Sequence, residues 1–83
     1  MLGTPQVYRE REFSFQVYFN EGREAPHVHV VRGGGAAKFW IAPVALCWNK
    51  GLNRGELRWI VRQLTERNAF FLEQWNAVQT QVR

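Results

Sequence analysis

Apolar and polar residues alternate along the first half of the chain, a pattern typical of β-strands that bury one face. The alternation is clearest over residues 13–19 and continues over residues 27–32 and 37–41. We therefore predict three antiparallel strands in these ranges and a short fourth strand over residues 44–46. The glycines at 33–35 predict a hairpin turn, because glycine adopts positive φ at little cost. A phosphate-binding loop would lead into a helix rather than into another strand.

The alternation also divides the side chains of the predicted sheet between two faces. The apolar set is expected to face the core: Phe13, Phe15, Val17, Phe19, Val28, Val30, Phe39 and Ile41. The other set would form an open face: Ser14, Gln16, Tyr18, His27, His29, Lys38 and Trp40. Both histidines of the chain fall on this open face, so we expect a functional surface there.

The second half of the chain has helical periodicity. Asn53 is placed to cap a helix, and Glu56 three residues later completes a capping-box pattern. An apolar stripe follows at helical spacing: Leu57, Ile60, Val61, Leu64, Phe71, Leu72, Trp75 and Val78. One straight helix over residues 54–82 would be about 43 Å long, but a domain of this size is roughly 30 Å across. We predict a bend or break at Arg67-Asn68, because Asn68 interrupts the stripe.

These patterns predict a single α+β domain over residues 1–83. An N-terminal arm (1–12) would precede an antiparallel sheet of three to four strands built from β-hairpins (13–48). One long or broken C-terminal helical region (53–82) would pack on one face of the sheet. Four Trp, six Phe and two Tyr supply large buried areas to so short a chain. A homodimer or another partner would add to that stability.

The net charge of +4 comes from the middle of the chain. Between residues 28 and 62 there are six basic residues and one acidic residue. Such an excess can attract nucleic acid or an acidic protein, although it is also what an ordinary solvated surface of a mildly basic domain shows. The lone Cys47 lies in an apolar run and is expected to be a buried, inert thiol. With no apolar stretch of about 20 residues and no apolar signal core, we expect a cytoplasmic protein that does not enter membranes.

The candidate binding surface consists of residues on and beside the open face: Tyr18, His27, His29, Arg32, Lys38 and Trp40. Protein docking is one use for it, because Tyr, Trp and His combine an apolar body with a polar tip. A structural use is also open, in which the histidines bond to Glu21, Glu24 or backbone groups. A metal site needs three or four ligands, and the chain has two histidines, one cysteine and no aspartate. We therefore expect neither a metal nor a cofactor.

The alternative to a binding function is that the protein cleaves RNA. The sequence therefore leaves open whether the protein is an enzyme. The candidate catalytic residues are His27, His29 and Lys38. One imidazole would take the proton of an RNA 2′-hydroxyl, and Lys38 or Arg32 would stabilise the negative charge that develops on the phosphate. Tyr18 or Trp40 would stack on a base. No metal is needed, and the same surface can bind RNA without cleaving it.

Two features of the helical region suggest further contacts. Trp59 and Phe70 lie off the apolar stripe on a common face, which indicates either a second interface or packing over the sheet edge. The arginines at positions 54, 58 and 62 form an i, i+4 row. This row is either a solvated flank of the helix or a contact for an acidic partner.

The chain resembles a family of small, mostly bacterial proteins, domain of unknown function family 4160. The resemblance runs from about Thr4 to the C-terminus and is carried by Pro26-His27-Val28-His29-Val30, the glycine run with Arg32, Ala37-Lys38-Phe39-Trp40 and residues 72–76 (Leu-Glu-Gln-Trp-Asn). It implies a stand-alone domain without an established activity, often encoded beside another small protein, as in a toxin–antitoxin pair. Leu52 stands where the family often has Phe.

Overall fold

The computed structural model describes residues 5–20 and 24–81, which form five strands and two helices. The strands are β1 (Gln6–Glu10), β2 (Phe13–Gln16), β3 (His27–Arg32), β4 (Gly35–Ile41) and β5 (Val44–Lys50). The helices are α1 (Arg54–Glu66) and α2 (Asn68–Gln81). The α+β class is confirmed, with five strands where three to four were predicted, and with the helical region, predicted as one long or broken helix, divided into two helices.

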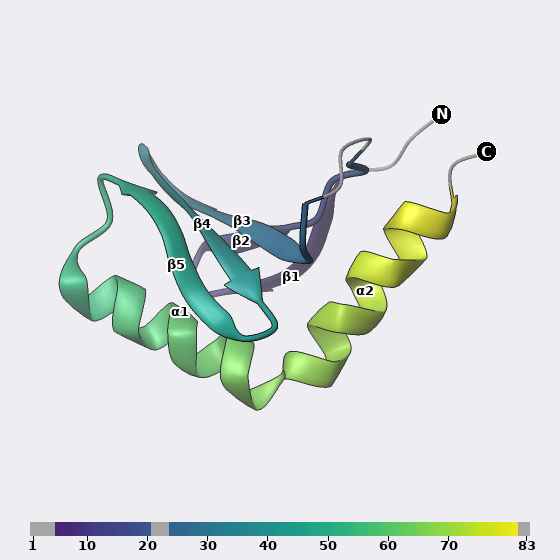
Figure 1. Ribbon diagram of the computed structural model, residues 1–83. Coiled ribbons are helices and arrows are strands. Elements are labelled where there is room, and N and C mark those ends of the chain that lie inside the picture. Colours follow the sequence, from purple (N-terminus) through teal and green to yellow (C-terminus); the bar gives the residue numbers. More distant parts are fainter. Residues whose placement is uncertain (1–4, 21–23, 82–83) are drawn as a thin grey trace.

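Each strand pairs antiparallel with the strand that precedes it, so the order in the sheet is β1-β2-β3-β4-β5. Both helices lie on the same side of the sheet, and α2 rises past the ends of the strands (Figure 1). The glycine turn joins β3 to β4 as predicted, and Gly33 there has a φ of +56°. A second hairpin joins β4 to β5 through a cis Ala42–Pro43 peptide bond.

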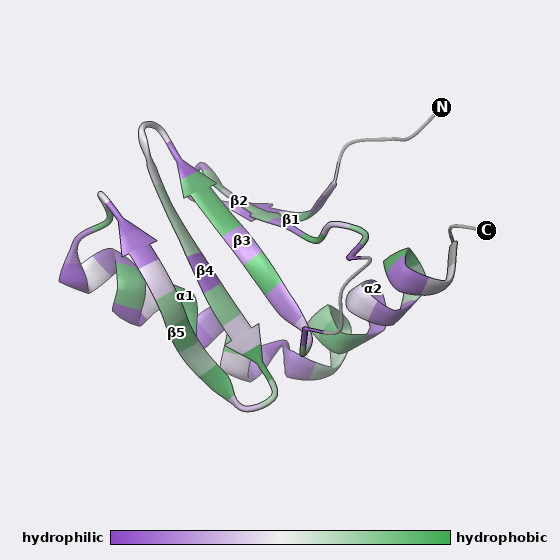
Figure 2. Cartoon of the chain, turned by 45° about the horizontal axis from the view of Figure 1, so that its top comes forward, coloured by the Kyte–Doolittle hydropathy of each residue, from purple (hydrophilic) through white to green (hydrophobic). Residues whose placement is uncertain are grey.

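The core lies between the sheet and the helices, and the alternation of the sequence decides which side chains enter it. Figure 2 shows the alternation as bands of hydrophobic and hydrophilic colour along β3. The fully or almost fully buried side chains are Phe13, Phe15, Val17, Val28, Val30, Ala37, Phe39, Ile41, Leu52, Ile60, Leu64, Phe71 and Trp75. Phe19 departs from the expectation: it follows the end of β2 and is 42% exposed.

The helix cap and the helix break lie where the sequence predicts them. Asn53 accepts a hydrogen bond from the Glu56 backbone N–H (2.7 Å), and the Glu56 carboxylate accepts one from the Asn53 backbone N–H (2.8 Å). The helical region breaks between α1 and α2 at Arg67. The Asn68 side-chain amide donates to the carbonyl of Ile41 at the end of β4 (2.8 Å). This partly buried hydrogen bond explains the asparagine on the apolar stripe.

Three expectations for the sheet are corrected. The N-terminal arm contains β1, which is fixed by pairing with β2. The fourth predicted strand extends to Lys50 as β5, and it is an edge strand of the sheet. Cys47 is exposed rather than buried, because Lys38 and Phe39 pair with Trp48 and Leu46 and leave it as the extra residue of a bulge.

In the described ranges, neither helix has the length and apolar character needed to cross a membrane.

Candidate functional site

The open face of the sheet gathers the candidate residues from four neighbouring strands. His29 on β3 pairs with Gln16 on β2 and with Lys38 on β4. Lys38 in turn pairs with Trp48 on β5. Paired residues point to the same side of a sheet, so the four side chains form a row across it. This side faces away from α1, whereas α2 passes the end of the sheet (Figure 1).

Aromatic rings gather on this face, and we call Tyr18, His29, Trp40 and Trp48 the open-face aromatic group. The ring centroid of His29 lies 5.4 Å from that of Tyr18 and 5.8 Å from that of Trp48. Tyr18 is 44% exposed and Trp48 is 41% exposed. Large apolar rings are therefore exposed to solvent on this face, away from its His27 end, which α2 covers.

Polar side chains beside this group hold one of its rings in place. The Tyr18 hydroxyl donates to Gln16 Oε1 (2.6 Å), and Gln16 Nε2 donates to the Ser14 hydroxyl (3.1 Å). Ser14 donates in turn to Gln6 Oε1 on β1 (2.7 Å). The chain of bonds orients the exposed Tyr18 ring before any ligand arrives. Ser14, expected on the open surface, is itself buried at the base of this network.

Lys38 is on the open face, but its charge is engaged. Its ammonium lies 2.7 Å from Glu24 Oε1 and 4.9 Å from the centre of the Trp40 ring. Its side chain is only 11% exposed. The hydrogen bond from Lys38 lowers the pKa of the Glu24 carboxyl, and the positive charge lowers it further. The ion pair therefore leaves little free positive charge at the centre of the face.

His27 is not on an open surface, which corrects the prediction. The residue is buried, and its ring centroid lies 4.8 Å from that of Trp75 on α2. Nδ1 lies 2.9 Å from the Ala25 carbonyl oxygen, which fits an N–H donor at that nitrogen. The alternation gave the correct side of the strand. His27 is nevertheless covered, because it begins β3 at the end of the sheet where α2 passes.

His29 is half-buried and is the more available imidazole of the two. Within the described chain its Nδ1 is buried and has no hydrogen-bond partner. Burial lowers the pKa of His29, and the neighbouring His27 and Lys38 lower it further against the opposing charge of Glu24. The neutral form is therefore favoured, so the ring presents both a donor and an acceptor nitrogen.

Arg32 does not belong to the open face, although it was predicted there. Val28, Val30 and Arg32 share the opposite side of β3. The guanidinium donates to Glu56 Oε2 (2.9 Å) at the start of α1 and lies 5.2 Å from the Phe13 ring centre. Arg32 therefore ties the sheet to α1. The alternation of the sequence already assigned it to this side.

Trp59 and Phe70, the predicted second interface, are partly buried and pack against the core of the domain. The Trp59 ring centroid lies 5.0 Å from that of Phe13, and the Arg11 guanidinium lies 5.0 Å from the centre of the Trp59 ring. Phe70 contacts Phe71 and Tyr8. Both rings cover the β1–β2 side of the core, which is the packing alternative that the sequence left open.

Trp48 is the residue of the site that the sequence analysis did not place on the open face. The strand predicted over 44–46 ended before it, and the bulge at Cys47 shifts the alternation by one residue. An apolar–polar count along 44–50 therefore gives no consistent face. The signal in the sequence that could have placed Trp48 on this face was the tryptophan itself, because the other residues that follow the predicted strand are small or polar.

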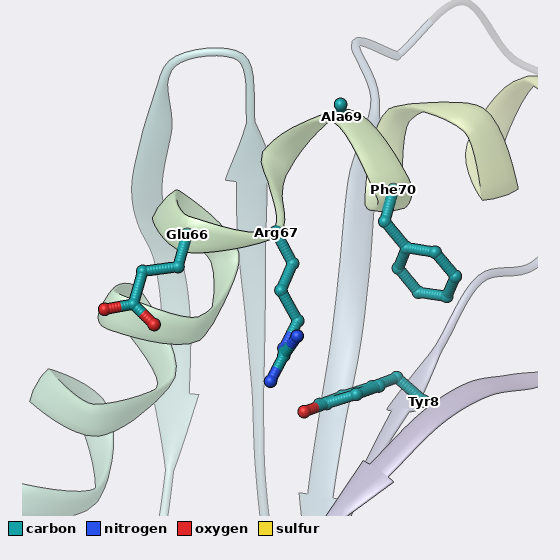
Figure 3. A pocket seen from close by; sticks show the side chains of 5 residues that line it. All are labelled: Tyr8, Glu66, Arg67, Ala69 and Phe70. Carbon is teal, nitrogen blue, oxygen red and sulfur yellow. The ribbon is translucent and has the colours of Figure 1, made fainter.

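A separate cleft lies at the break between the helices (Figure 3). It has a volume of about 400 Å³ and is lined by Tyr8, Glu66, Arg67, Ala69 and Phe70. The Arg67 guanidinium lies 4.9 Å from the centre of the Tyr8 ring. Burial and the hydrogen bond to Glu10 raise the pKa of Tyr8. Neither here nor elsewhere in residues 5–20 and 24–81 do three metal-ligating side chains come together.

Comparison with known families identifies the family of this chain. Residues 13–76 match the family described as Domain of unknown function (DUF4160), and the chain therefore belongs to that family. The matched region begins at β2 and ends within α2, so it includes the candidate site except for the polar contact to β1. Comparisons with curated proteins and with solved structures gave no match.

Proposed function

We propose that this DUF4160 protein is a non-catalytic interaction module that docks a small partner protein on the open face of its sheet. The observation that carries the proposal is the open-face aromatic group. Its two most exposed rings, Tyr18 and Trp48, flank the half-buried His29. Tyrosine and tryptophan at the centre of a patch are typical of residues that dominate protein–protein binding energies.

The polar surroundings of the group support docking. Tyr18 is held by Gln16, so little side-chain freedom is lost when a partner binds. Lys38 is paired with Glu24, so the centre of the patch is apolar and nearly neutral. A neutral aromatic centre inside a polar rim fits a folded protein surface better than it fits a phosphate backbone, which requires unpaired cations.

We propose further that the partner is encoded beside this protein and that the two form a toxin–antitoxin-like pair in the bacterial cytoplasm. This part rests on the family resemblance. A small domain has a limited core of its own, and a partner on the open face would bury the exposed rings. A homodimer through the same face is the competing assembly.

The ribonuclease alternative is less well supported by the positions of its three residues. His27 is buried against Trp75, and Lys38 is bound to Glu24. His29 alone remains half-open, and one imidazole without a free cation lacks the group that would stabilise the phosphorane. RNA binding by stacking on Tyr18 and Trp48 needs no catalytic group, and it is an outcome of the test below.

Co-expression with the neighbouring protein tests the proposal. A tagged chain should copurify with that protein, and Trp48→Ala should weaken the complex by about tenfold or more. Glu73→Ala, an exposed change on α2, is the control and should leave the affinity unchanged. Thermal melts of each variant separate lost binding from lost folding.

Three outcomes would refute the docking proposal. The first is a complex that survives both Tyr18→Ala and Trp48→Ala. The second is a purified chain that carries RNA and loses it with the same substitutions. The third is RNA cleavage that His29→Ala abolishes while partner binding persists, which would contradict the non-catalytic part of the proposal and establish an enzyme.

A further inference from the structure

A groove on the helix side of the sheet runs between the edge strand β5 and α1, away from the open face. It has a volume of about 320 Å³ and is lined by Phe39, Leu46, Leu57, Val61, Arg54 and Arg58. Leu46 is 46% exposed and Val61 is 38% exposed. Two large aliphatic side chains from different elements therefore meet at the surface without a covering layer.

The strand beside the groove has an unused edge. β5 pairs with β4 on one side, and on its other side the described part of the chain supplies no strand. All residues of β5 after Val44 are exposed. The outward backbone N–H and C=O groups of such an edge can accept a further strand.

The wall of the groove that α1 forms carries arginines whose positive charges are not neutralised within the described chain. Arg54, Arg58 and Arg62 follow one another at i, i+4 spacing on α1, and all three are exposed. Within residues 5–20 and 24–81, none of the three makes an ion pair, a side-chain hydrogen bond or a cation–π contact. By contrast, Arg32, Arg11 and Arg67 all have such partners.

We propose that this groove binds an extended, acidic segment of a partner protein, which adds to β5 as a sixth strand. The edge of β5 would supply backbone hydrogen bonds. Every second side chain of the segment would face the groove, where apolar residues meet Leu46 and Val61 and carboxylates meet Arg54 and Arg58.

Charge favours an acidic segment over the two main alternatives, which are a second copy of the chain and nucleic acid. A second copy pairing edge to edge through β5 would bring two arginine rows together, and like charges oppose that contact. Nucleic acid would satisfy the arginines but would leave the four apolar side chains of the groove against a charged backbone. An acidic segment with alternating apolar residues satisfies both parts of the surface.

A synthetic peptide tests the proposal without knowledge of the natural partner. The probe is a fluorescein-labelled nonamer, Thr-Val-Thr-Glu-Thr-Val-Thr-Glu-Thr, and its control carries Lys in place of both Glu residues. The protein should bind the acidic peptide in preference to the basic one, more weakly as salt is raised. In backbone amide NMR, the peptide should shift signals of β5 and α1.

Charge reversal gives the decisive comparison. Arg54→Glu with Arg58→Glu should weaken binding of the acidic peptide by about tenfold and give the basic peptide the preference. Arg9→Glu, on the opposite edge strand β1, is the matched control and should change neither. Tyr18→Ala should also leave peptide binding unchanged, so this proposal and the open-face docking proposal can fail independently.

Several results would overturn the proposal. One is equal binding of both peptides, or a preference that charge reversal does not exchange. Another is a set of amide shifts confined to β1 or to the open face. A third is tighter binding of oligouridylate than of the acidic peptide with the same arginine dependence. A fourth is a dimer in sedimentation analysis that Leu46→Thr dissociates, since the groove would then be occupied by a second copy.

Discussion

The glycine turn between β3 and β4 allows a sharp test of the packing. A Cβ atom added at Gly35 would lie 2.7 Å from Leu52 Cδ2. It would also lie 3.2 Å from both the carbonyl carbon and the carbonyl oxygen of Gly51. The backbone there cannot easily retreat, because the Asn49 side chain bonds both the N–H and the C=O of Leu52. Overpacking of this kind costs about 1–3 kcal/mol, which we expect for Gly35→Ala.

The neighbouring glycine is the matched control. A Cβ at Gly34 meets nothing within 4 Å, and the φ of Gly34 is not positive. Gly34→Ala should therefore leave stability unchanged or raise it by about 0.4–1 kcal/mol, since alanine restricts the unfolded chain. In a domain of this size, 1 kcal/mol corresponds to about 4–8 °C in Tm. Thermal melts followed by circular dichroism should separate the two variants clearly.

The clash with Leu52 can be isolated by a double-mutant cycle. In a Leu52→Ala background the space near Gly35 opens, so Gly35→Ala should cost less there than in the parent chain. Equal Tm values for Gly34→Ala and Gly35→Ala, or equal costs of Gly35→Ala in both backgrounds, would refute the reasoning.

Three further predictions address single interactions. Because the pKa of His29 in the fold lies below its ordinary 6.5, the unfolded chain binds that proton more tightly, and stability should fall as pH drops below about 6.5. Urea unfolding at pH 7.5 and pH 5 should show a smaller difference for His29→Gln, and an unchanged difference would contradict the pKa direction. Asn68→Leu leaves the Ile41 carbonyl without its donor and should cost about 1–3 kcal/mol in the same assay, whereas a neutral result would contradict the role of that bond. Asn53→Ala removes half of the capping box and should cost about 1 kcal/mol, with Asn53→Asp as a control that retains an acceptor and most of the stability.

Local signals predicted much of the fold. Periodicity of two gave the correct sides for Phe15, Val28 and Phe39, because a side chain's face in a strand depends only on its position along that strand. The capping box needs two residues three positions apart, and it was visible for the same reason. Asn68 marked the helix break, because an amide on an apolar stripe requires a buried partner.

Non-local contacts account for the parts that could not be predicted. β1 carries no strict alternation and exists because its residues pair with β2. The cover on His27 comes from Trp75, which lies 48 positions away in the sequence. Trp48 joins the candidate site only because a bulge at Cys47 shifts the face of β5. The residues next to a position in the sequence do not indicate where a distant helix lies, or which residue of a strand is left unpaired in a bulge.

The strand order has a kinetic consequence. Since each strand pairs with its immediate predecessor, the sheet assembles by closing loops between consecutive strands, and the entropic penalty of such closures grows slowly with loop length. Low relative contact order is associated with rapid folding. The central hairpin of β3 and β4 offers a natural nucleus, onto which flanking strands can zip outward in both directions before the helices dock.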